Sequence, residues 1–274
     1  MLLTLAWRNI WRNRRRSVIT ISSIGFAVFF SAMFMSMQYV SLIDMIDKVV
    51  RFYTGHAQIQ QNGFYDERTL DNSMAYEAAM IDGLESLEGV SVAVPRVESF
   101  ALSAFENNTR AAMVFGIDLD REDQITRLSE NLVEGKRLSA NDDGVMIGQG
   151  LAEYLAIGVG DTLILISQGY HGANAAGLYP VRGIIKLSNP GQNKGMVAMT
   201  LGQAQYFYAL ENRITSIAVL ADESQPLQVT FANIQSSMTS DELIFMDYEE
   251  LVPELVQLMD MKTSSATIMI MILY

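Results

Sequence analysis

The sequence contains no cysteine and only two histidines and five prolines among its 274 residues. The absence of cysteine excludes a disulfide framework and a thiolate metal site. His56 and His171 lie far apart, and no metal-ligand spacing surrounds either of them. We therefore expect no metal site in this chain and an ordinary structural role for each histidine.

Motifs for catalysis and nucleotide binding are also missing. There is no G-x-S-x-G nucleophile elbow and no G-x-x-x-x-G-K-[ST] loop for ATP phosphates. The glycines Gly148 and Gly150 precede an expected helix, where such a pair either binds an anion or makes a turn. The carboxylate pairs Asp142-Asp143 and Glu249-Glu250 fall in expected surface stretches, which favours solvated charge over acid–base catalysis. We expect no catalytic residue and no enzymatic activity.

Charge is absent from Ser17 to Ile43, a run of 27 residues. As a helix this run spans roughly 40 Å, more than the ~30 Å hydrocarbon core of a bilayer. A cleaved signal peptide is the main alternative, but its apolar region is normally only about 7–15 residues long and ends at a small-x-small site. No such site follows here, so the sequence predicts an uncleaved transmembrane helix over 17–43.

Acidic residues are absent from the first sixteen positions, which hold five arginines. All 31 acidic residues lie between Asp44 and Asp260 together with 13 basic ones, so this stretch carries a net charge of −18. An acidic body disfavours nucleic acid as a partner. Because positive flanks stay in the cytoplasm, we expect a cytoplasmic N-terminus and an external main domain.

Residues 1–16 have the pattern of a helix that lies in the membrane interface. Apolar and aromatic side chains follow helical spacing on one face, and arginines follow it on another, which suits the headgroup plane. A simple topogenic flank is the alternative to a lever at the inner membrane surface. The expected interface residues are Trp7, Trp11, Arg8, Arg12, Arg15 and Arg16.

The other end of the sequence is uncharged after Lys262, in "TSSATIMIMILY". Twelve helical residues cover only about 18 Å, too little to cross a membrane. The segment is either a buried core segment or the start of a second transmembrane helix whose remainder is absent from this sequence, and we favour the second. In the preceding "DYEELVPELVQLMDM", Pro253 either kinks a helix or occupies its first turn.

Two β-α-β patterns bracket the middle of the chain. The first consists of "GHAQIQ", "MAYEAAMIDGLESLEGV" and "VSVAVPRV", and the second of "ITSIAVLAD", "QPLQVTFANIQSSM" and "ELIFMDY". They form a weak internal duplication and predict one shared sheet of the α+β type.

The region between these patterns is expected to be mostly β. A strand, "TRAAMVFGID", is followed by an expected loop rich in Asp and Arg. "GVMIGQGLAEYLAIGVGDTLILIS" predicts strand, helix, tight turn and strand, and "TLGQAQYFYAL" predicts a later helix. Three glycines in "QGYHGANAAGLYP" predict a long, mobile hairpin loop before the strand "YPVRGIIKL".

Several of these segments together resemble the MacB/FtsX-like ABC transporter permeases, with the Lol-type lipoprotein-releasing permeases as the closest branch. They are "LAWRNIWRNRRRSVIT", "GHAQIQ", "GVMIGQGLAEYLAIGVGDTLIL" and "GMVAMTLGQAQ". The strongest part is G-x-x-L-A-x-x-L-x-[IV]-x-x-G-D, from Gly148 to Asp161. The order of the segments carries the resemblance, which covers nearly the whole chain.

The resemblance implies a bacterial inner-membrane protein with four transmembrane helices and a large periplasmic domain between the first two. The implied division is a cytoplasmic interfacial helix 1–16, a transmembrane helix 17–43, a porter-like subdomain 44–106 with 213–260, an inserted subdomain 107–212, and the start of a second transmembrane helix 261–274.

The implied function is mechanical transmission. ATP and Mg would be bound by a separate cytoplasmic ABC ATPase dimer, with no cofactor in this chain, and a second permease copy or a paralogue would complete the complex. The implied activity is extraction of lipoproteins from the inner membrane. An efflux or signalling permease for a small molecule or peptide, or a membrane-anchored binding protein, is the alternative.

Two sets of contact residues follow from the resemblance. In Lol-type relatives the outer parts of the first two helices enclose acyl chains, and Met and Phe suit flexible chains, although plain lipid contact is the alternative. The corresponding positions are Phe29, Phe30, Met33, Phe34, Met37 and Tyr39. The glycine-rich hairpin stands where one Lol subtype receives a periplasmic lipoprotein chaperone, and its expected contacts are Tyr170, Leu178, Tyr179 and Pro180.

Overall fold

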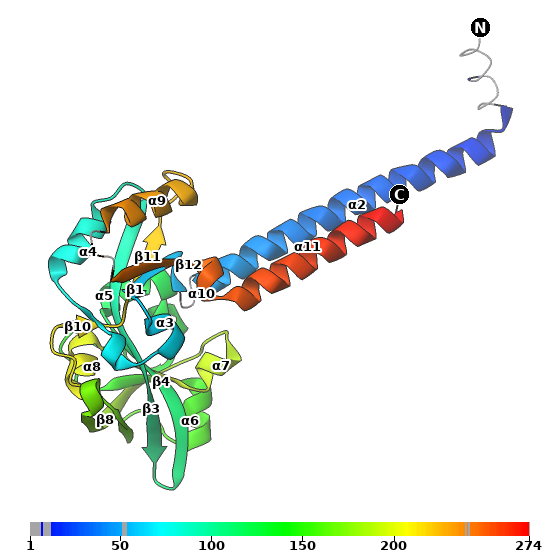
Figure 1. The fold of residues 1–274 in the computed structure, drawn as a ribbon. Coiled ribbons are helices and arrows are strands. Elements are labelled where there is room, and N and C mark those ends of the chain that lie inside the picture. The colour runs from blue at the N-terminus through cyan, green and yellow to red at the C-terminus, as the bar shows by residue number, and fades with distance from the viewer. Residues whose placement is uncertain (1–6, 8–11, 51–53, 239, 241, 274) are drawn as a thin grey trace. The chain divides into compact units, whose positions relative to one another are not determined.

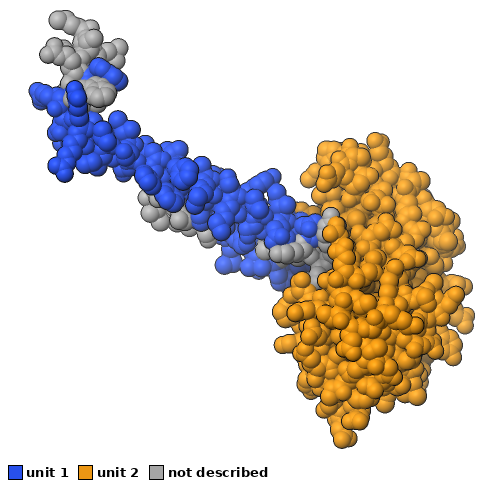
Figure 2. All heavy atoms as spheres, turned by 180° about the vertical axis from the view of Figure 1, so that it is seen from behind, with its two compact units in different colours: residues 1–48, 252–274 blue, residues 49–251 orange. Residues whose placement is uncertain are grey.

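A computed structural model of the chain describes residues 7, 12–50, 54–238, 240 and 242–273. The chain divides into two compact units, coloured separately in Figure 2. One comprises residues 1–48 and 252–274, and the other comprises residues 49–251. Each unit is described by itself.

The first unit consists of two long helices that lie side by side, α2 (Arg14–Val49) and α11 (Pro253–Leu273) (Figure 1). Proline suits the first position of α11 because its missing N–H would be unpaired there in any case. Lys262 Nζ of α11 donates a hydrogen bond to Ser41 Oγ of α2 at 2.9 Å. Pro253 therefore occupies the first turn of a helix, one of the two roles expected for it.

The apolar part of α2 confirms the expected long, apolar N-terminal helix. The segment Arg14–Asp44 is 31 residues long with a mean hydropathy of 2.1. Among the described residues it is the one helix long and apolar enough to cross a membrane. The expected start of a second span, 261–274, lies within α11 up to Leu273, and Tyr274 lies outside the described residues. This second span stays a prediction.

Half of the second unit is built from the two predicted β-α-β patterns. Its elements are β1 (Ala57–Gln61), α4 (Ala78–Glu85), β3 (Val90–Phe105), β11 (Ser216–Ala221), α9 (Leu227–Ser237) and β12 (Leu243–Asp247). The strands lie in the order β12-β1-β11-β3, and each neighbouring pair is antiparallel. Each β-α-β unit is thus split by a strand of the other, as in ferredoxin-like folds. Side chains of α4 and α9 pack on one face of this sheet, where Ile81 and Ile234 join the core around Ile59.

The other half is a closed ring of six strands. Besides β3 it contains β4 (Asn108–Ile117), β6 (Val145–Gly148), β7 (Thr162–Gln168), β8 (Asn174–Ile185) and β9 (Met196–Thr200). Their pairings run β3-β4-β9-β6-β8-β7 and return to β3. Buried side chains such as Leu163, Leu165 and Met199 belong to the main core, as do residues of α6 (Gln149–Leu155) and α8 (Leu201–Phe207). Small barrels are filled by side chains in this way.

Short elements complete the unit. They are α3 (Phe64–Glu67), a 3₁₀ turn (Leu70–Asn72), β2 (Met74–Ala75), α5 (Leu119–Thr126), a 3₁₀ turn (Leu128–Asn131), β5 (Leu132–Gly135), a 3₁₀ turn (Tyr170–Gly172), α7 (Pro190–Asn193), β10 (Arg213–Ile214) and α10 (Tyr248–Leu251). Because β3 belongs to both halves, strands of the two predicted subdomains share one sheet. The predicted boundaries, 44–106 with 213–260 and 107–212, stay a prediction.

The expected loop rich in Asp and Arg is wrong, because this segment contains helix α5. The Asp118 carboxylate accepts hydrogen bonds from the backbone N–H groups of Asp120 and Arg121 and so caps the first turn. Ile125 is fully buried against the sheet beside Val92 and Val94. The charged residues therefore mark an amphipathic helix.

The expected long hairpin loop is also wrong. Strands β7 and β8 pair from Thr162–Pro180 to Gln168–Asn174, so only residues 169–173 form the turn. The glycines misled the prediction because they serve close packing. A Cβ on Gly177 would lie 2.6 Å from the Tyr179 ring, and one on Gly169 would lie 2.6 Å from the Tyr208 carbonyl oxygen.

Candidate functional site

The expected cargo residues lie on α2, and the structure separates them into three positions. Phe29, Phe30, Met33 and Met37 are exposed and share one side of the helix by their spacing. The Phe29 and Phe30 rings meet edge to face with centroids 5.7 Å apart. Tyr39 is exposed but lies elsewhere on the circumference by its spacing. The structure therefore offers an apolar surface of four side chains, and its use for cargo stays a prediction.

The sixth residue, Phe34, lies in a seam. Ala27, Ser31, Phe34, Gln38 and Ser41 are buried or half-buried, whereas every other side chain from 18 to 40 is exposed. Their alternating spacing of four and three is the spacing of packed helices. Small side chains in such a seam let two backbones approach closely. The buried hydroxyl of Ser31 finds no hydrogen-bond partner among the described residues.

The expected membrane-interface residues are only partly described. Trp7, Arg12, Arg15 and Arg16 are exposed. Arg8 and Trp11 lie outside the described residues. The interfacial role of all six therefore stays a prediction.

The expected chaperone contacts lie on the β7–β8 hairpin and are held firmly. The backbone N–H of Tyr170 donates to the Tyr208 carbonyl at 2.8 Å, and the Arg213 guanidinium lies 5.1 Å from the centre of the Tyr170 ring. Leu178 is 68% exposed and Pro180 is half-buried, whereas Tyr179 is only 8% exposed. Burial raises the pKa of the Tyr179 hydroxyl above its usual range. Of the four residues, Leu178 is the most exposed, and their role as chaperone contacts stays a prediction.

A buried ion pair is the main feature that the sequence analysis missed. The Arg96 side chain, only 1% exposed, donates through Nε and Nη2 to the two carboxylate oxygens of Glu122 at 2.8 and 2.7 Å. Its Nη1 lies 3.7 Å from Glu98 Oε1, which also accepts from the Ser216 hydroxyl at 3.2 Å. The signal was present, because Arg and Glu interrupt an otherwise apolar strand in "VSVAVPRVESF". This network fastens α5 to β3.

A second buried polar feature lies on β1. Gln60 Nε2 donates to Gln58 Oε1 at 2.7 Å, and both side chains are buried. The remaining amide atoms, Gln58 Nε2 and Gln60 Oε1, have no hydrogen-bond partner among the described residues. Polar side chains therefore line the strand that follows α2 in the chain.

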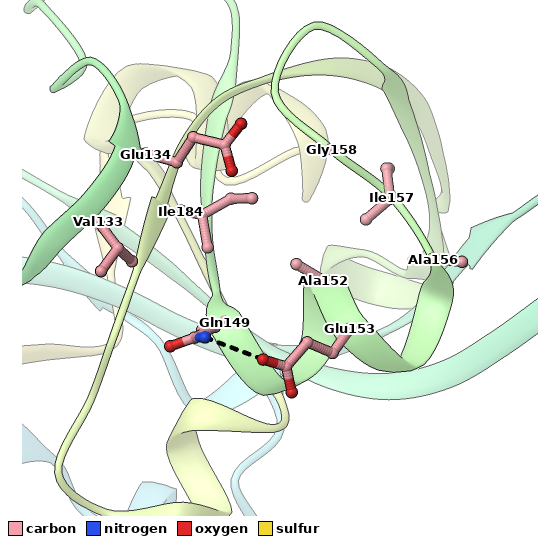
Figure 3. Close-up of a pocket in the computed structure, with 9 residues that line it drawn as sticks. All are labelled: Val133, Glu134, Gln149, Ala152, Glu153, Ala156, Ile157, Gly158 and Ile184. Atoms are coloured by element: carbon pink, nitrogen blue, oxygen red, sulfur yellow. Dashed lines mark hydrogen bonds between the residues drawn. The ribbon is translucent and has the colours of Figure 1, made fainter.

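A hollow in the second unit brings together polar side chains of β5 and α6. Figure 3 shows a hollow of about 470 Å³ in which Gln149 Nε2 donates to Glu153 Oε1 at 2.9 Å, with Glu134 on another wall. Among the described residues no group of three or more His, Cys, Asp or Glu side chains is placed to hold a metal ion. The nearby glycines are explained by packing, since a Cβ on Gly148 would lie 2.4 Å from the Asn193 carbonyl oxygen.

The paired carboxylates have structural partners. Arg182 donates to Asp142 at 2.9 Å and to Asp143 at 2.6 Å. Burial alone would raise the pKa of Asp142, but hydrogen bonds from Arg182 and the Gly144 N–H hold it below its usual value. His56 Nδ1 accepts from the Ala221 N–H at 2.9 Å. Asp142 and Asp143 therefore form ion pairs with Arg182, and the His56 side chain binds a backbone N–H group.

Residues 17–237 match the model of the MacB-like periplasmic core domain. The chain belongs to this family. The match begins in α2 and ends in α9, so it covers the ferredoxin-like half and the strand ring described above. No curated protein matches the chain.

Two solved structures are similar to this chain at low identity, and the first of them shows the same kind of fold. The periplasmic region of MacB from Actinobacillus actinomycetemcomitans is 13% identical with a TM-score of 0.53, and the match covers 78% of this chain and 98% of that one. The extracellular domain of the noncanonic ABC-type transporter YknZ from Gram-positive bacteria is 13% identical with a TM-score of 0.49, covering 69% and 98%. The family places the chain among ABC permeases. It is a transport component that contains an N-terminal apolar helix and a periplasmic domain. The closeness to the Lol-type branch stays a prediction.

Proposed function

We propose that this chain is the permease subunit that carries ATP-driven motion from a cytoplasmic ABC ATPase dimer to a periplasmic domain, and that it extracts lipoproteins from the bacterial inner membrane. A second permease copy completes the complex, and ATP and Mg are bound by the ATPase. The N-terminal arginines keep that end of α2 in the cytoplasm.

The main support for this proposal is the way in which α2 and α11 connect to the neighbouring strands β1 and β12. Helix α2 ends at Val49 and β1 begins at Ala57, while β12 ends at Asp247 and α11 begins at Pro253. Strands β1 and β12 are direct neighbours that pair over five residues, from Ala57–Asp247 to Gln61–Leu243. Both helices thus continue by short connections into one hydrogen-bonded strand pair. A displacement of either helix acts on that pair with little slack.

The length of α2 also supports transmission. Its 36 residues span roughly 54 Å, against ~30 Å of hydrocarbon. The helix therefore extends well beyond the bilayer, as a stalk requires.

The surface of α2 supports an amphiphilic cargo. Phe29, Phe30, Met33 and Met37 present aromatic rings and flexible thioethers side by side, and such side chains adapt to chains of variable shape. A lipoprotein's acyl chains fit this surface, and so does any other membrane amphiphile.

The experiment compares two methionines of α2 that have similar exposure, Met33 at 51% and Met35 at 55%. Met33 lies on the proposed cargo side, and Met35 lies on another side of the helix. Cells that depend on this chain carry either Met33→Asn or Met35→Asn, and lipoproteins in their inner and outer membranes are quantified after fractionation. We expect several-fold retention in the inner membrane for Met33→Asn and a distribution near wild type for Met35→Asn.

Other outcomes separate the parts of the proposal. Equal effects of both variants would contradict the assigned cargo side. An unchanged lipoprotein distribution after depletion of the whole chain would show an efflux or signalling permease instead. Purification of the chain from native membranes without any ATPase would contradict the ABC complex itself.

A further inference from the structure

One half of the outer surface of the strand ring is bare and uncharged. We name it the uncharged face. It consists of the outward-facing side chains of β3 from Phe100 to Ala104, β4 from Thr109 to Met113, β7 from Ile164 to Gln168 and β8 from Asn174 to Leu178, all exposed or half-buried. None of them is charged. Arg110 is the one charged residue in these segments. It lies between two outward-facing residues of β4, and its guanidinium is 4.5 Å from the centre of the Tyr154 ring.

Another part of the ring's outer surface is covered. Outward side chains of β4, β6, β8 and β9 further along the strands, such as Phe115, Met146 and Ile185, are buried in a second cluster with Leu119, Leu128 and Leu138. The uncharged face lacks such a cover, and it holds four of the exposed large apolar side chains, Phe100, Leu102, Ile166 and Leu178. Contiguous apolar surface of this kind marks an interaction site.

The uncharged face carries both a projection and a hollow. Leu178 projects at one corner with 68% of its surface exposed. At the opposite corner, a hollow of about 290 Å³ is lined by Phe100, Ala111 and Met113 of the face together with Gly191 and Gly195, and the charged Arg68 lies at its wall. A hollow of this size accommodates a leucine side chain.

The strand register places Ile166 midway between the two. Leu178 is opposite Ile164, the previous outward residue on the strand of Ile166. Ile166 is opposite Leu102, the next outward residue on the strand of Phe100. The path from Leu178 to Ile166, and again from Ile166 to Phe100, crosses to the neighbouring strand and shifts by one outward-facing residue. Each of these two moves covers roughly 8 Å. A two-fold axis through Ile166 brings each Leu178 onto the hollow of the other copy.

We propose that the uncharged face is the contact between two copies of this chain, with Ile166 at the two-fold axis and Leu178 of each copy in the Phe100–Met113 hollow of the other. An isologous contact requires such self-complementarity. The inference rests on the proposed pairing of two permease copies and adds the surface by which their periplasmic domains meet.

The small area favours an anchored second copy over a soluble partner, and the lack of charge on the face permits this contact. The body of each copy, residues 44–260, carries a net charge of −18, so two copies avoid like-charge contacts where charge is absent. The face measures roughly 400 Å² from strand and residue spacings, about half of the ~800 Å² per partner in a stable interface. A contact this small holds poorly between free proteins. It suffices between copies anchored in one membrane, where the effective concentration is high.

These 274 residues contain no cysteine, and any cysteine elsewhere in the protein is replaced by serine, so each introduced thiol reports from one position. Full-length chains carrying Ile166→Cys, Leu178→Cys or the mixture of Leu178→Cys with Phe100→Cys are treated in native membranes with a short bismaleimide. The control is Tyr206→Cys, which is 88% exposed on α8 and lies outside the uncharged face. Two affinity tags on separate copies report whether copies pair at all.

We expect Ile166→Cys to form a dimer several-fold more efficiently than Tyr206→Cys. Leu178→Cys alone should fail, because the two thiols would lie at least ~17 Å apart, but it should link to Phe100→Cys of another copy. Co-purification of tagged copies without the Ile166 link would overturn the proposed surface and leave pairing intact. Absence of co-purification would overturn pairing itself, and equal linking of Tyr206→Cys or linking to a different protein would overturn the assigned contact.

Discussion

Arg96 shows at the level of a single residue how this domain tolerates charge in its interior. Its guanidinium is buried and makes a two-pronged contact with Glu122, and Glu98 lies on its other side. Planar, paired hydrogen bonds of this kind compensate much of the cost of removing the charges from water.

Removing Glu122 should therefore be costly. Glu122→Ala leaves the Arg96 charge buried with only its more distant carboxylate, and we expect the free energy of unfolding to fall by about 3 kcal/mol. The measurement is urea unfolding of the chain followed by circular dichroism. The matched control is Asp120→Ala, which removes the exposed partner of Arg137 at 2.8 Å and should cost less than ~1 kcal/mol. Similar losses for both variants would contradict the special role of the buried pair.

At the level of elements, regular alternation and helical spacing predicted β1, β3, β4, β6, β7, the second part of β8, β11 and β12 and the helices α6, α8 and α9. No strand was predicted at β9. Glycine and charge misled the prediction in two places, the β7–β8 hairpin and α5. Both residue types are enriched in loops, and only the packing partners show that Gly177 makes room for a ring and that Asp118 begins a helix. The predicted helix over 74–90 is shorter in the structure, because Met74–Ala75 pairs with β10.

The junction of β6 and α6 allows a test of glycine packing. In Gly148→Ala the new Cβ meets the Asn193 carbonyl at 2.4 Å, and we expect a loss of about 1–3 kcal/mol in the free energy of unfolding. In Gly202→Ala, within α8, the Cβ has no heavy atom within 4 Å. That variant should be stabilised by about 0.5–1 kcal/mol, because alanine favours helices over glycine. Thermal unfolding of both variants checks the pair, and a stable Gly148→Ala would contradict the packing explanation.

At the level of the whole molecule, an acidic body and an uncharged face have opposite effects on association. The −18 charge repels a second copy at long range, and salt screens that repulsion, with a Debye length that falls from about 10 Å at 0.1 M to about 3 Å at 1 M. The apolar contact itself does not depend on ion pairs.

We therefore expect the yield of Ile166→Cys crosslinking to rise as sodium chloride is increased from low to moderate concentration. The measurement is the dimer fraction on denaturing gels at fixed crosslinker and protein concentration, with Tyr206→Cys as the collision control. A yield that falls with salt would mean that the copies are held by ion pairs, and the uncharged face would then not be their contact.

Local composition along the chain was enough to predict the long apolar N-terminal helix, the acidic body and the two β-α-β units, because hydropathy, net charge and residue period are properties of contiguous segments. The family was predicted from a resemblance that lay in the order of several segments. Only the fold decided that Arg96 meets Glu122, that six strands close into a ring, and that Phe100, Ile166 and Leu178 share one bare face. The ion pair joins residues 26 positions apart, and the face joins residues up to 78 positions apart. They depend on strand register and side-chain direction, which are set by how the whole chain buries its apolar surface.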